Sequence, residues 1–404
     1  MTRGSGFIWR LLAGVSVAGM GLSGWMQSGA LAAASAAGLV YVLWRATRGS
    51  APPAAVGALP ASGESAAPVR RVPREANNIE DLVEEMLAQG RYAILLRPQV
   101  AKGLTEAQFT RARQTLEEAM GLVPDGEVAL GAIDEVLADG RLSDEELLAA
   151  RARVVRVDHF FLDRYPVTNR QFFEFVAAGG YEQIALWDES IWPAVLQFVD
   201  RTSMPGPAFW QNGSFEPGKD DHPVVGVSWY EAAAYARWVG KRLPSDAEWV
   251  KAGSWPVQLS ATKRVQRRYP WGDNMDRKRT NLWGTGTGGT SAVTAFPDGV
   301  SVGGVYDLIG NVWEWTRGDF RGYGEDDLVL DVPMKSVRGG AFDSYFDNQA
   351  TCHFQSGENP ISRKPNIGFR CALGVCDLLL NWVPPVAEEA GAETEGESLE
   401  EVVV

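Results

Sequence analysis

The chain has 404 residues, of which 45% are hydrophobic and 22% charged, so it can bury the core of a large globular domain. Its formal net charge of −13 argues against an electrostatic nucleic-acid-binding protein. Three cysteines without a Cys-x-x-Cys pair argue against a disulfide scaffold and a zinc ribbon. The 15 Trp and 44 Gly are typical of a loop-rich fold whose irregular backbone is held by large aromatic side chains.

The N-terminus contains a long apolar stretch. No charged residue occurs from Leu11 to Trp44, which is more than one span of about 20 residues requires. Residues 25–29 interrupt this stretch and divide it into two short spans, 7–26 and 30–44. Basic residues flank the outer end of each span, and none lies in the connection. By the positive-inside rule we expect a membrane anchor at residues 1–48, with the large domain in the cytoplasm.

Two alternatives to this topology remain. The basic start, the apolar stretch and the small residues at 30–34 also resemble a signal peptide, which would place the domain in the periplasm or outside the cell. However, a cleaved signal peptide does not need the second apolar run at 38–44. A single long, tilted span would likewise place the domain outside.

Two segments have the composition of unstructured chain. Residues 49–78 are rich in Ala, Pro, Gly and Ser and are predicted to be a linker that holds the domain away from the bilayer. Residues 378–404 contain seven glutamates and no basic residue, which predicts a disordered, solvated tail. An acidic interaction tail is the alternative interpretation of this segment.

Between the linker and the main domain, residues 79–118 are predicted to be a helical segment with a structural role. Apolar residues recur there at helical spacing. Thr105 followed by Gln108 forms a capping box, which predicts a helix that ends near Gly121.

From residue 119 the pattern changes to a mixed α+β domain that we expect to end at 377. Its helices are few and start at clear signals, whereas long Gly- and Trp-rich stretches with short strands separate them. Buried irregular backbone must be satisfied by side chains, ions or water, which favours a bound cation. The three capping boxes in this region are Thr168 with Gln171, Ser228 with Glu231, and Ser245 with Glu248.

Several motifs, taken in order, resemble one family. They are Leu122-Val-Pro-Asp-Gly-Glu-Val-Ala-Leu-Gly131, Leu162-Asp-Arg-Tyr-Pro-Val-Thr-Asn-Arg-Gln-Phe172, His222-Pro-Val-Val-Gly-Val-Ser-Trp229, Gly240-Lys-Arg-Leu-Pro-Ser-Asp-Ala-Glu-Trp249, Tyr269-Pro-Trp-Gly272, Asp307-Leu-Ile-Gly-Asn-Val-Trp-Glu-Trp315, Arg338-Gly-Gly340 and Asn366-Ile-Gly-Phe-Arg-Cys371. Together they resemble the formylglycine-generating-enzyme, or sulfatase-modifying-factor, domain. This resemblance implies a C-type-lectin-like fold over residues 119–377.

The resemblance also shows which catalytic group this chain lacks. Formylglycine-generating enzymes oxidise a substrate cysteine with Cu(I), which they bind through two cysteines shortly after the Arg-Gly-Gly motif. The corresponding positions here are Ser344 and Gln349, and residues 341–351 contain no cysteine. Hydroxyl and amide groups are poor ligands for soft Cu(I). We therefore expect no copper cofactor and no formylglycine production by that route.

A sister group resembling the ergothioneine-pathway sulfoxide synthases binds iron through histidines on a separate helical domain. The only histidines here are His159, His222 and His353, and none lies in residues 79–120. The resemblance therefore implies that this iron site is absent.

Calcium is the metal that the resemblance implies. One family site corresponds to the side chains of Asp307 and Glu314 and the carbonyls of Gly310 and Val312, and these oxygen ligands suit Ca²⁺. Alternatively, the two carboxylates cap the turn without an ion. A second site would include Asn281 and Leu282, but the loop at 284–289 has no carboxylate, so that site is doubtful.

The family's secreted members pair the cysteine of their Gly-Phe-Arg-Cys motif with a cysteine on the Ser-Trp helix. Here Cys371 is present, but the helix position is Ala236, so that bridge cannot form. The missing bridge fits a reducing compartment. We expect the three cysteines to be buried small hydrophobic residues.

Around the family's active-site cleft lies a polar set that suits recognition of a polar ligand or peptide, although a solvated loop would have the same composition. Its members are Asp343, Ser344, Tyr345, Asp347, Asn348, Gln349 and His353.

We expect a membrane-tethered, non-catalytic binding or scaffolding module. Its partners would be the membrane, membrane proteins or a polar peptide, and not nucleic acid. The alternative is a divergent oxidoreductase of the same family, in which Asp343, Asp347 and His353 supply metal ligands or acid–base groups. A third hypothesis is a structural subunit of a membrane complex.

Overall fold

A computed structural model describes residues 78–131, 141–143, 152–260, 263–285, 287–320 and 333–381. All described residues belong to one compact unit within residues 54–404. The predicted spans 7–26 and 30–44 lie outside the described residues, as do the predicted linker up to residue 77 and the acidic tail from 382. Among the residues that the structure describes, no helix has the length and apolar character needed to cross a bilayer.

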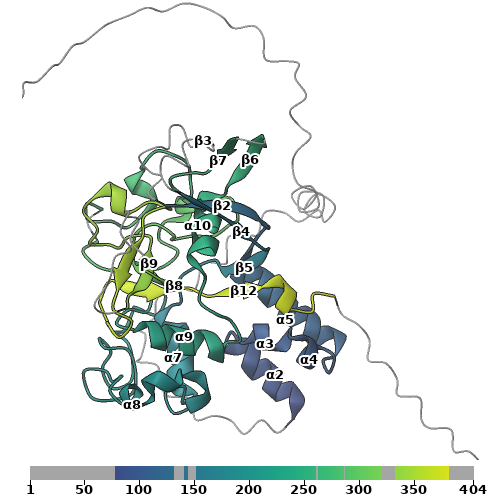
Figure 1. Cartoon of the computed structure of the whole chain (residues 1–404). Helices are drawn as coiled ribbons and strands as arrows, with labels where there is room; N and C mark the ends of the chain where they lie inside the picture. Colours follow the sequence, from purple (N-terminus) through teal and green to yellow (C-terminus); the bar gives the residue numbers. More distant parts are fainter. Residues whose placement is uncertain are drawn as a thin grey trace, which may run out of the picture. The chain divides into compact units, whose positions relative to one another are not determined.

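The predicted helical segment forms four helices, α2 (Ile79–Ala88), α3 (Tyr92–Leu95), α4 (Pro98–Ala101) and α5 (Glu106–Ala119). The capping box that starts α5 is confirmed, because Thr105 and Gln108 each accept the other's backbone N–H. These helices lie beside β5 (Phe160–Asp163) and β12 (Ala372–Gly374) (Figure 1). Phe109 and Leu116 of α5 share one buried cluster with Phe161 and Leu373 from those strands. The helical segment therefore completes the core of the main domain.

Two sheets organise the domain. The first has the order β1-β5-β12, with β1 (Met120–Val123) and β12 both antiparallel to the central, buried β5. The second has the order β10-β9-β8-β11 and comprises β10 (Ser356–Glu358), β9 (Lys335–Arg338), β8 (Trp313–Asp319) and β11 (Ile367–Phe369). In it β8 runs antiparallel to β9 but parallel to β11, with Trp313 opposite Ile367. The second sheet places the Trp-Glu-Trp, Arg-Gly-Gly and Gly-Phe-Arg motifs next to one another.

Two smaller sheets complete the strands. One pairs β2 (Gly126–Leu130) with β4 (Arg153–Val157), and the other has the order β3-β7-β6, formed by β3 (Arg141–Ser143), β7 (Lys263–Val265) and β6 (Val257–Ser260). Longer helices are α7 (Asn169–Ala177), α9 (Trp229–Trp238) and α10 (Asp246–Ser254), each starting at its predicted capping box. The remaining elements are the short α8 (Trp192–Val195) and 3-10 helices at Ile184–Leu186, Glu189–Ile191, Arg277–Arg279, Pro297–Gly299, Asp347–Gln349 and Val375–Asp377. The mixed α+β prediction is confirmed.

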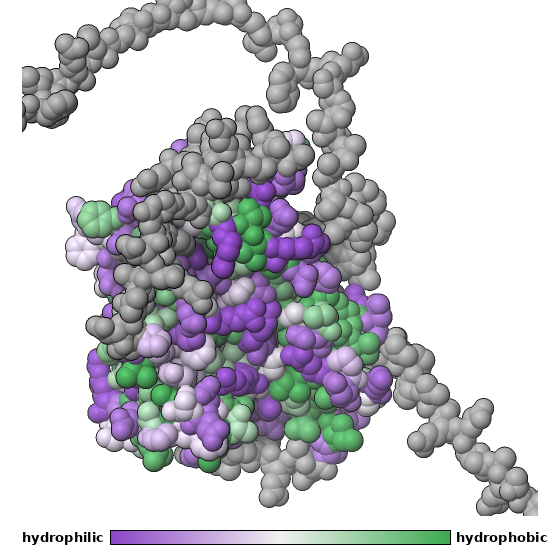
Figure 2. Space-filling model, in the orientation of Figure 1, coloured by the Kyte–Doolittle hydropathy of each residue, from purple (hydrophilic) through white to green (hydrophobic). Residues whose placement is uncertain are grey.

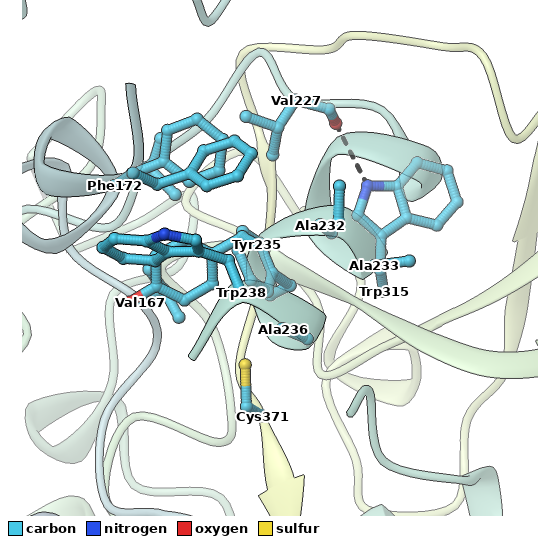
Figure 3. Close-up of a cluster of buried hydrophobic side chains, with 14 of the residues drawn as sticks. Val167, Phe172, Val227, Ala232, Ala233, Tyr235, Ala236, Trp238, Trp315 and Cys371 are labelled. Carbon is cyan, nitrogen blue, oxygen red and sulfur yellow. Dashed lines mark hydrogen bonds between the residues drawn. The ribbon is translucent and has the colours of Figure 1, made fainter. Parts of the chain in front are cut away.

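An aromatic core joins α7 and α9 to the second sheet. Phe172 stacks on Tyr235 with ring centroids 5.5 Å apart, and the indole of Trp315 donates a hydrogen bond of 3.1 Å to the Val227 carbonyl (Figure 3). Ala236 and Cys371 belong to this same buried cluster, and the Cys371 thiol is free. Burial is confirmed for Cys352 and Cys371, but that prediction is wrong for Cys376, which is exposed.

Candidate functional site

The candidate site lies on the loop that follows β9. Gly339 and Gly340 start this loop with φ angles of 97° and 76°, a backbone conformation that glycine adopts readily. A Cβ on Gly339 would lie 2.6 Å from the Leu308 carbonyl oxygen, so a larger residue does not fit. The Gly310 N–H donates to the Gly339 carbonyl at 2.9 Å. The Arg-Gly-Gly motif therefore fixes the start of the loop against the 307–314 segment.

Ser344, at the position of the family's first copper cysteine, has a structural role. Its side chain is buried, and its Oγ accepts a hydrogen bond of 2.9 Å from the Ala341 N–H. Its carbonyl accepts from the Trp283 N–H at 3.3 Å, which joins this loop to the loop at 281–285. Gln349 is half-buried at the end of the 3-10 helix Asp347–Gln349.

The two predicted acids of the loop are exposed. Asp343 accepts two hydrogen bonds, of 3.1 and 2.9 Å, from the Asn366 amide nitrogen, and Asp347 forms an ion pair with Arg277. The Oδ1 atom of Asn366 is buried and has no hydrogen-bond partner among the described residues. A buried acceptor of this kind costs free energy unless a donor reaches it, so it marks a position where a buried water can donate.

Three exposed aromatic side chains flank these acids. Trp283, Tyr345 and Phe346 are 60%, 64% and 61% exposed, and the rings of Tyr345 and Phe346 meet edge to face at 5.1 Å. We call these three side chains the aromatic patch. The hydrogen bond from Trp283 to Ser344 places both contributing loops side by side. Sequence reasoning missed Trp283 and Phe346. Phe346 lies within the predicted polar set at 343–349, which is the signal that could have found it, whereas no local pattern joins Trp283 to that loop.

His353, the remaining member of the predicted polar set, is not in this exposed group. It is buried, its Nε2 lies 3.0 Å from the Arg267 carbonyl, and its Nδ1 lies 3.3 Å from the Gln266 amide nitrogen. Burial, assisted by the positive charges of Arg338 and Arg268, lowers the pKa of His353 to about 3. The imidazole is therefore neutral at physiological pH and is built into the core behind the loop.

Beneath the loop, Glu314 takes part in a fully buried ion pair. Both of its oxygens accept hydrogen bonds of 2.7 Å from the Arg370 guanidinium, and Oε2 also accepts one of 2.8 Å from the Trp249 indole. Arg370 donates further to the carbonyls of Asp163, Arg164, Tyr306 and Asp307. This network ties together four segments that are far apart in the sequence. Arg370 and Trp249 had not been identified by sequence reasoning as partners of Glu314.

Asp307 is also buried, but it has no ion-pair partner among the described residues. Its Oδ2 accepts a hydrogen bond of 2.7 Å from the Asn311 amide, and its φ angle is 55°. Burial raises the pKa of Asp307 to about 7, against the opposing effects of the Asn311 hydrogen bond and the nearby Arg370. A bound cation would stabilise the ionised form of this carboxylate.

The structure brings the two predicted calcium segments together. Asn281 forms a parallel bridge with Gly310, and the Asn281 carbonyl accepts from the Asn311 N–H at 2.8 Å. The Asn281 side-chain oxygen and the Leu282 carbonyl both accept hydrogen bonds from the Thr285 hydroxyl. In the described part of the chain, no three His, Cys, Asp or Glu side chains gather as metal ligands. Of the predicted ligands, Glu314 is engaged by Arg370, whereas Asp307 is a buried carboxylate without an ion-pair partner in the described part of the chain.

Comparison with known proteins places these features in a family. The chlamydial kinase pkn1 of Chlamydia pneumoniae is 30% identical over 312 residues, which are 74% of this chain and 45% of the kinase. Inactive C-alpha-formylglycine-generating enzyme 2 of Mus musculus is 35% identical over 55% of this chain and 77% of that protein. The formylglycine-generating enzyme of Thermomonospora curvata is 33% identical over 65% of this chain and 95% of that protein.

The chain spans about a third to a half of the length of the chlamydial kinases that it matches. The family model of the sulfatase-modifying factor enzyme 1-like domain matches residues 105–375, which include both sheets of the domain and the candidate site. The chain therefore belongs to the family of sulfatase-modifying factor enzyme 1-like domains, as its motifs predicted.

Proposed function

We propose that the domain is a non-catalytic binding module, tethered to the membrane through residues 1–48 and facing the cytoplasm. The main observation behind this proposal is the structural role of Ser344, at the position of the family's first copper cysteine. In place of a thiol it presents a hydroxyl that is buried and closes a turn through the Ala341 N–H. Gln349 supplies only a neutral amide. The buried thiol of Cys371, which has no disulfide partner, fits a reducing compartment.

The binding surface of this module consists of the aromatic patch and the exposed carboxylate of Asp343. Large exposed aromatic side chains are the typical anchors of protein interfaces, because they bury much area at low entropic cost. The exposed carboxylate of Asp343 accepts from the neutral Asn366 amide, and its negative charge suits a cationic donor on a ligand. This chemistry favours a polar peptide with a basic residue. Relatives that include an enzyme named inactive support a family member without catalysis.

The proposal is tested with copper. The purified full chain, given Cu(I) and a sulfatase-type cysteine peptide, is expected to form no aldehyde and to hold no stoichiometric copper, because it offers a hydroxyl and an amide to a metal that prefers thiolates. The double variant Ser344→Cys/Gln349→Cys is expected to gain Cu(I) binding, measured by competition with a chromogenic Cu(I) chelator.

Ser344→Ala/Gln349→Ala is the matched control and is expected to hold no more copper than the parent chain. Aldehyde formation by the parent chain would instead support the divergent oxidoreductase. So would stoichiometric copper or iron in the protein as purified.

Calcium at Asp307 belongs to the same proposal, with the structural role of neutralising a buried carboxylate. Ca²⁺ at about ten times its Kd is expected to raise the free energy of unfolding by about 1.4 kcal/mol. Asp307→Asn is expected to remove this increment, whereas Asp298→Asn, at an exposed acid, is expected to keep it. Thermal unfolding with Ca²⁺ and with a chelator measures the difference. An equal response of all three proteins would contradict a site at Asp307.

A further inference from the structure

Lys251, in the last turn of α10, is a lysine that the fold encloses. Helix α10 packs against β2 and β4 (Figure 1), and only 4% of Lys251 is exposed. A Cβ on Gly126, the first residue of β2, would lie 3.1 Å from the Lys251 Nζ, so the glycine leaves room for the amine. On the side of the molecule in Figure 2, hydrophilic residues cover much of the described surface, which is where lysines are normally found.

The amine of Lys251 has no hydrogen-bond or ion-pair partner among the described residues. Lys241 is different, because its Nζ lies 2.7 Å from the carboxylate of Asp163. An enclosed ammonium without such a partner costs free energy, which favours loss of its proton. Burial therefore lowers the pKa of Lys251 to about 8, with Asp125 opposing this effect and Arg156 assisting it.

The uncharged amine of Lys251 is a nucleophile, which an ammonium is not. The fall in its pKa from 10.5 to about 8 raises the uncharged fraction near neutral pH more than about a hundredfold. The enclosure of the side chain restricts which electrophile can reach it. The reagent has to be small and uncharged, which excludes bulky acyl donors and fits carbon dioxide.

A carbamate is anionic, so its stability depends on the charges beside Lys251. Asp125, which directly precedes Gly126, accepts a hydrogen bond of 2.8 Å from the Nη2 atom of Arg156. The side chains of this pair are 37% and 67% exposed, and an exposed ion pair contributes little to stability. The guanidinium of Arg156 can therefore turn towards a new anion on Lys251, whereas the carboxylate of Asp125 would repel it.

We propose that Lys251 captures carbon dioxide as a carbamate beside the Asp125–Arg156 pair. The lone pair of Nζ forms a bond to the carbon of carbon dioxide, one C–O π pair moves onto oxygen, and the nitrogen loses a proton to water. The addition is reversible and involves no oxidation or reduction. It is independent of the ligand-binding role of the aromatic patch, because it uses none of that patch's residues.

Trapping of the adduct on the full chain tests this site. The purified chain in detergent is equilibrated with isotope-labelled bicarbonate at mildly alkaline pH, ethylated with a trialkyloxonium salt and digested for mass spectrometry. The labelled carbamate ester is expected on Lys251 at least roughly tenfold more often than on the exposed Lys102. Carbon NMR of the untrapped sample is expected to show a carbamate signal that Lys251→Met removes.

Two variants of the neighbouring charges are expected to have opposite effects. Asp125→Asn is expected to raise the occupancy of Lys251 at least roughly threefold, and Arg156→Met to lower it by a similar factor. Arg153→Met, at an exposed residue on the opposite face of the same strand, is the matched control and is expected to leave occupancy unchanged. Labelling of Lys251 no higher than that of Lys102 would overturn the proposal. Occupancy that Asp125→Asn and Arg156→Met leave unchanged, or shift in the same direction, would also overturn it.

Discussion

Replacing Arg370 with Met is expected to lower the free energy of unfolding by about 3–5 kcal/mol, because it leaves the Glu314 carboxylate buried without its counter-charge. The side chains of both residues have no solvent exposure, and two hydrogen bonds of 2.7 Å join them. The substitution also removes the donors to the carbonyls of Tyr306 and Asp307. Denaturant titration followed by tryptophan fluorescence measures the loss.

The double variant Arg370→Met/Glu314→Gln separates the charge from the packing. The neutral amide keeps an acceptor for the Trp249 indole but leaves no buried charge unpaired. We therefore expect the double variant to be more stable than Arg370→Met alone. If Arg370→Met lost less than about 1 kcal/mol, the value of an exposed ion pair, the network would not hold the four segments together.

The elements that could be predicted from the sequence are those whose signals are local. A capping box needs only residues three apart, and the boxes starting at Thr105, Thr168, Ser228 and Ser245 all start helices. The motifs around Arg338-Gly-Gly340 likewise identified the family correctly, because a motif can be matched from its letters alone, although the steric neighbour of Gly339 is the Leu308 carbonyl, far away in the sequence.

Burial and long-range partners could not be predicted in the same way. Arg370 contacts Glu314, 56 residues earlier, and the Asp163 carbonyl, 207 residues earlier, and no local pattern encodes these distances. For the same reason His353 was placed among exposed polar residues, although the fold encloses it, and Cys376 was expected inside but lies on the surface. The calcium prediction is untested, but Arg370 shows that Glu314 already has a strong partner.

These buried groups connect the fold with the proposed binding surface. The Gly310–Gly339 hydrogen bond and the Asn281–Gly310 bridge link the 307–314 segment to both loops that carry the aromatic patch. Arg370 holds the start of that segment by donating hydrogen bonds to the carbonyls of Tyr306 and Asp307. The exposed aromatics therefore lie on loops with a rigid support, which lowers the entropic cost of binding.

Acid is expected to destabilise the protein through His353. The neutral ring donates from Nε2 to the Arg267 carbonyl, and its Nδ1 accepts from the Gln266 amide, which also donates to the Ala129 carbonyl at 2.8 Å. Protonation would put a second donor against that amide and a charge beside Arg338 and Arg268. The folded-state pKa of about 3 thus lies below the unfolded value of about 6.5.

The unfolded chain therefore binds more protons between these two values. His353 contributes stability that is complete above pH 6.5 and is lost as the pH falls towards 3. The loss from this residue at pH 5 is expected to be about 2 kcal/mol.

Denaturant titrations at pH 7 and pH 5 measure this loss of stability. His353→Gln, which has no titrating ring, is expected to lose correspondingly less stability than the parent chain. His159→Gln is the matched control at an exposed histidine and is expected to behave like the parent. A ring of His353 that titrates near pH 6.5 by NMR would instead mean that the side chain is open to solvent and available for acid–base chemistry.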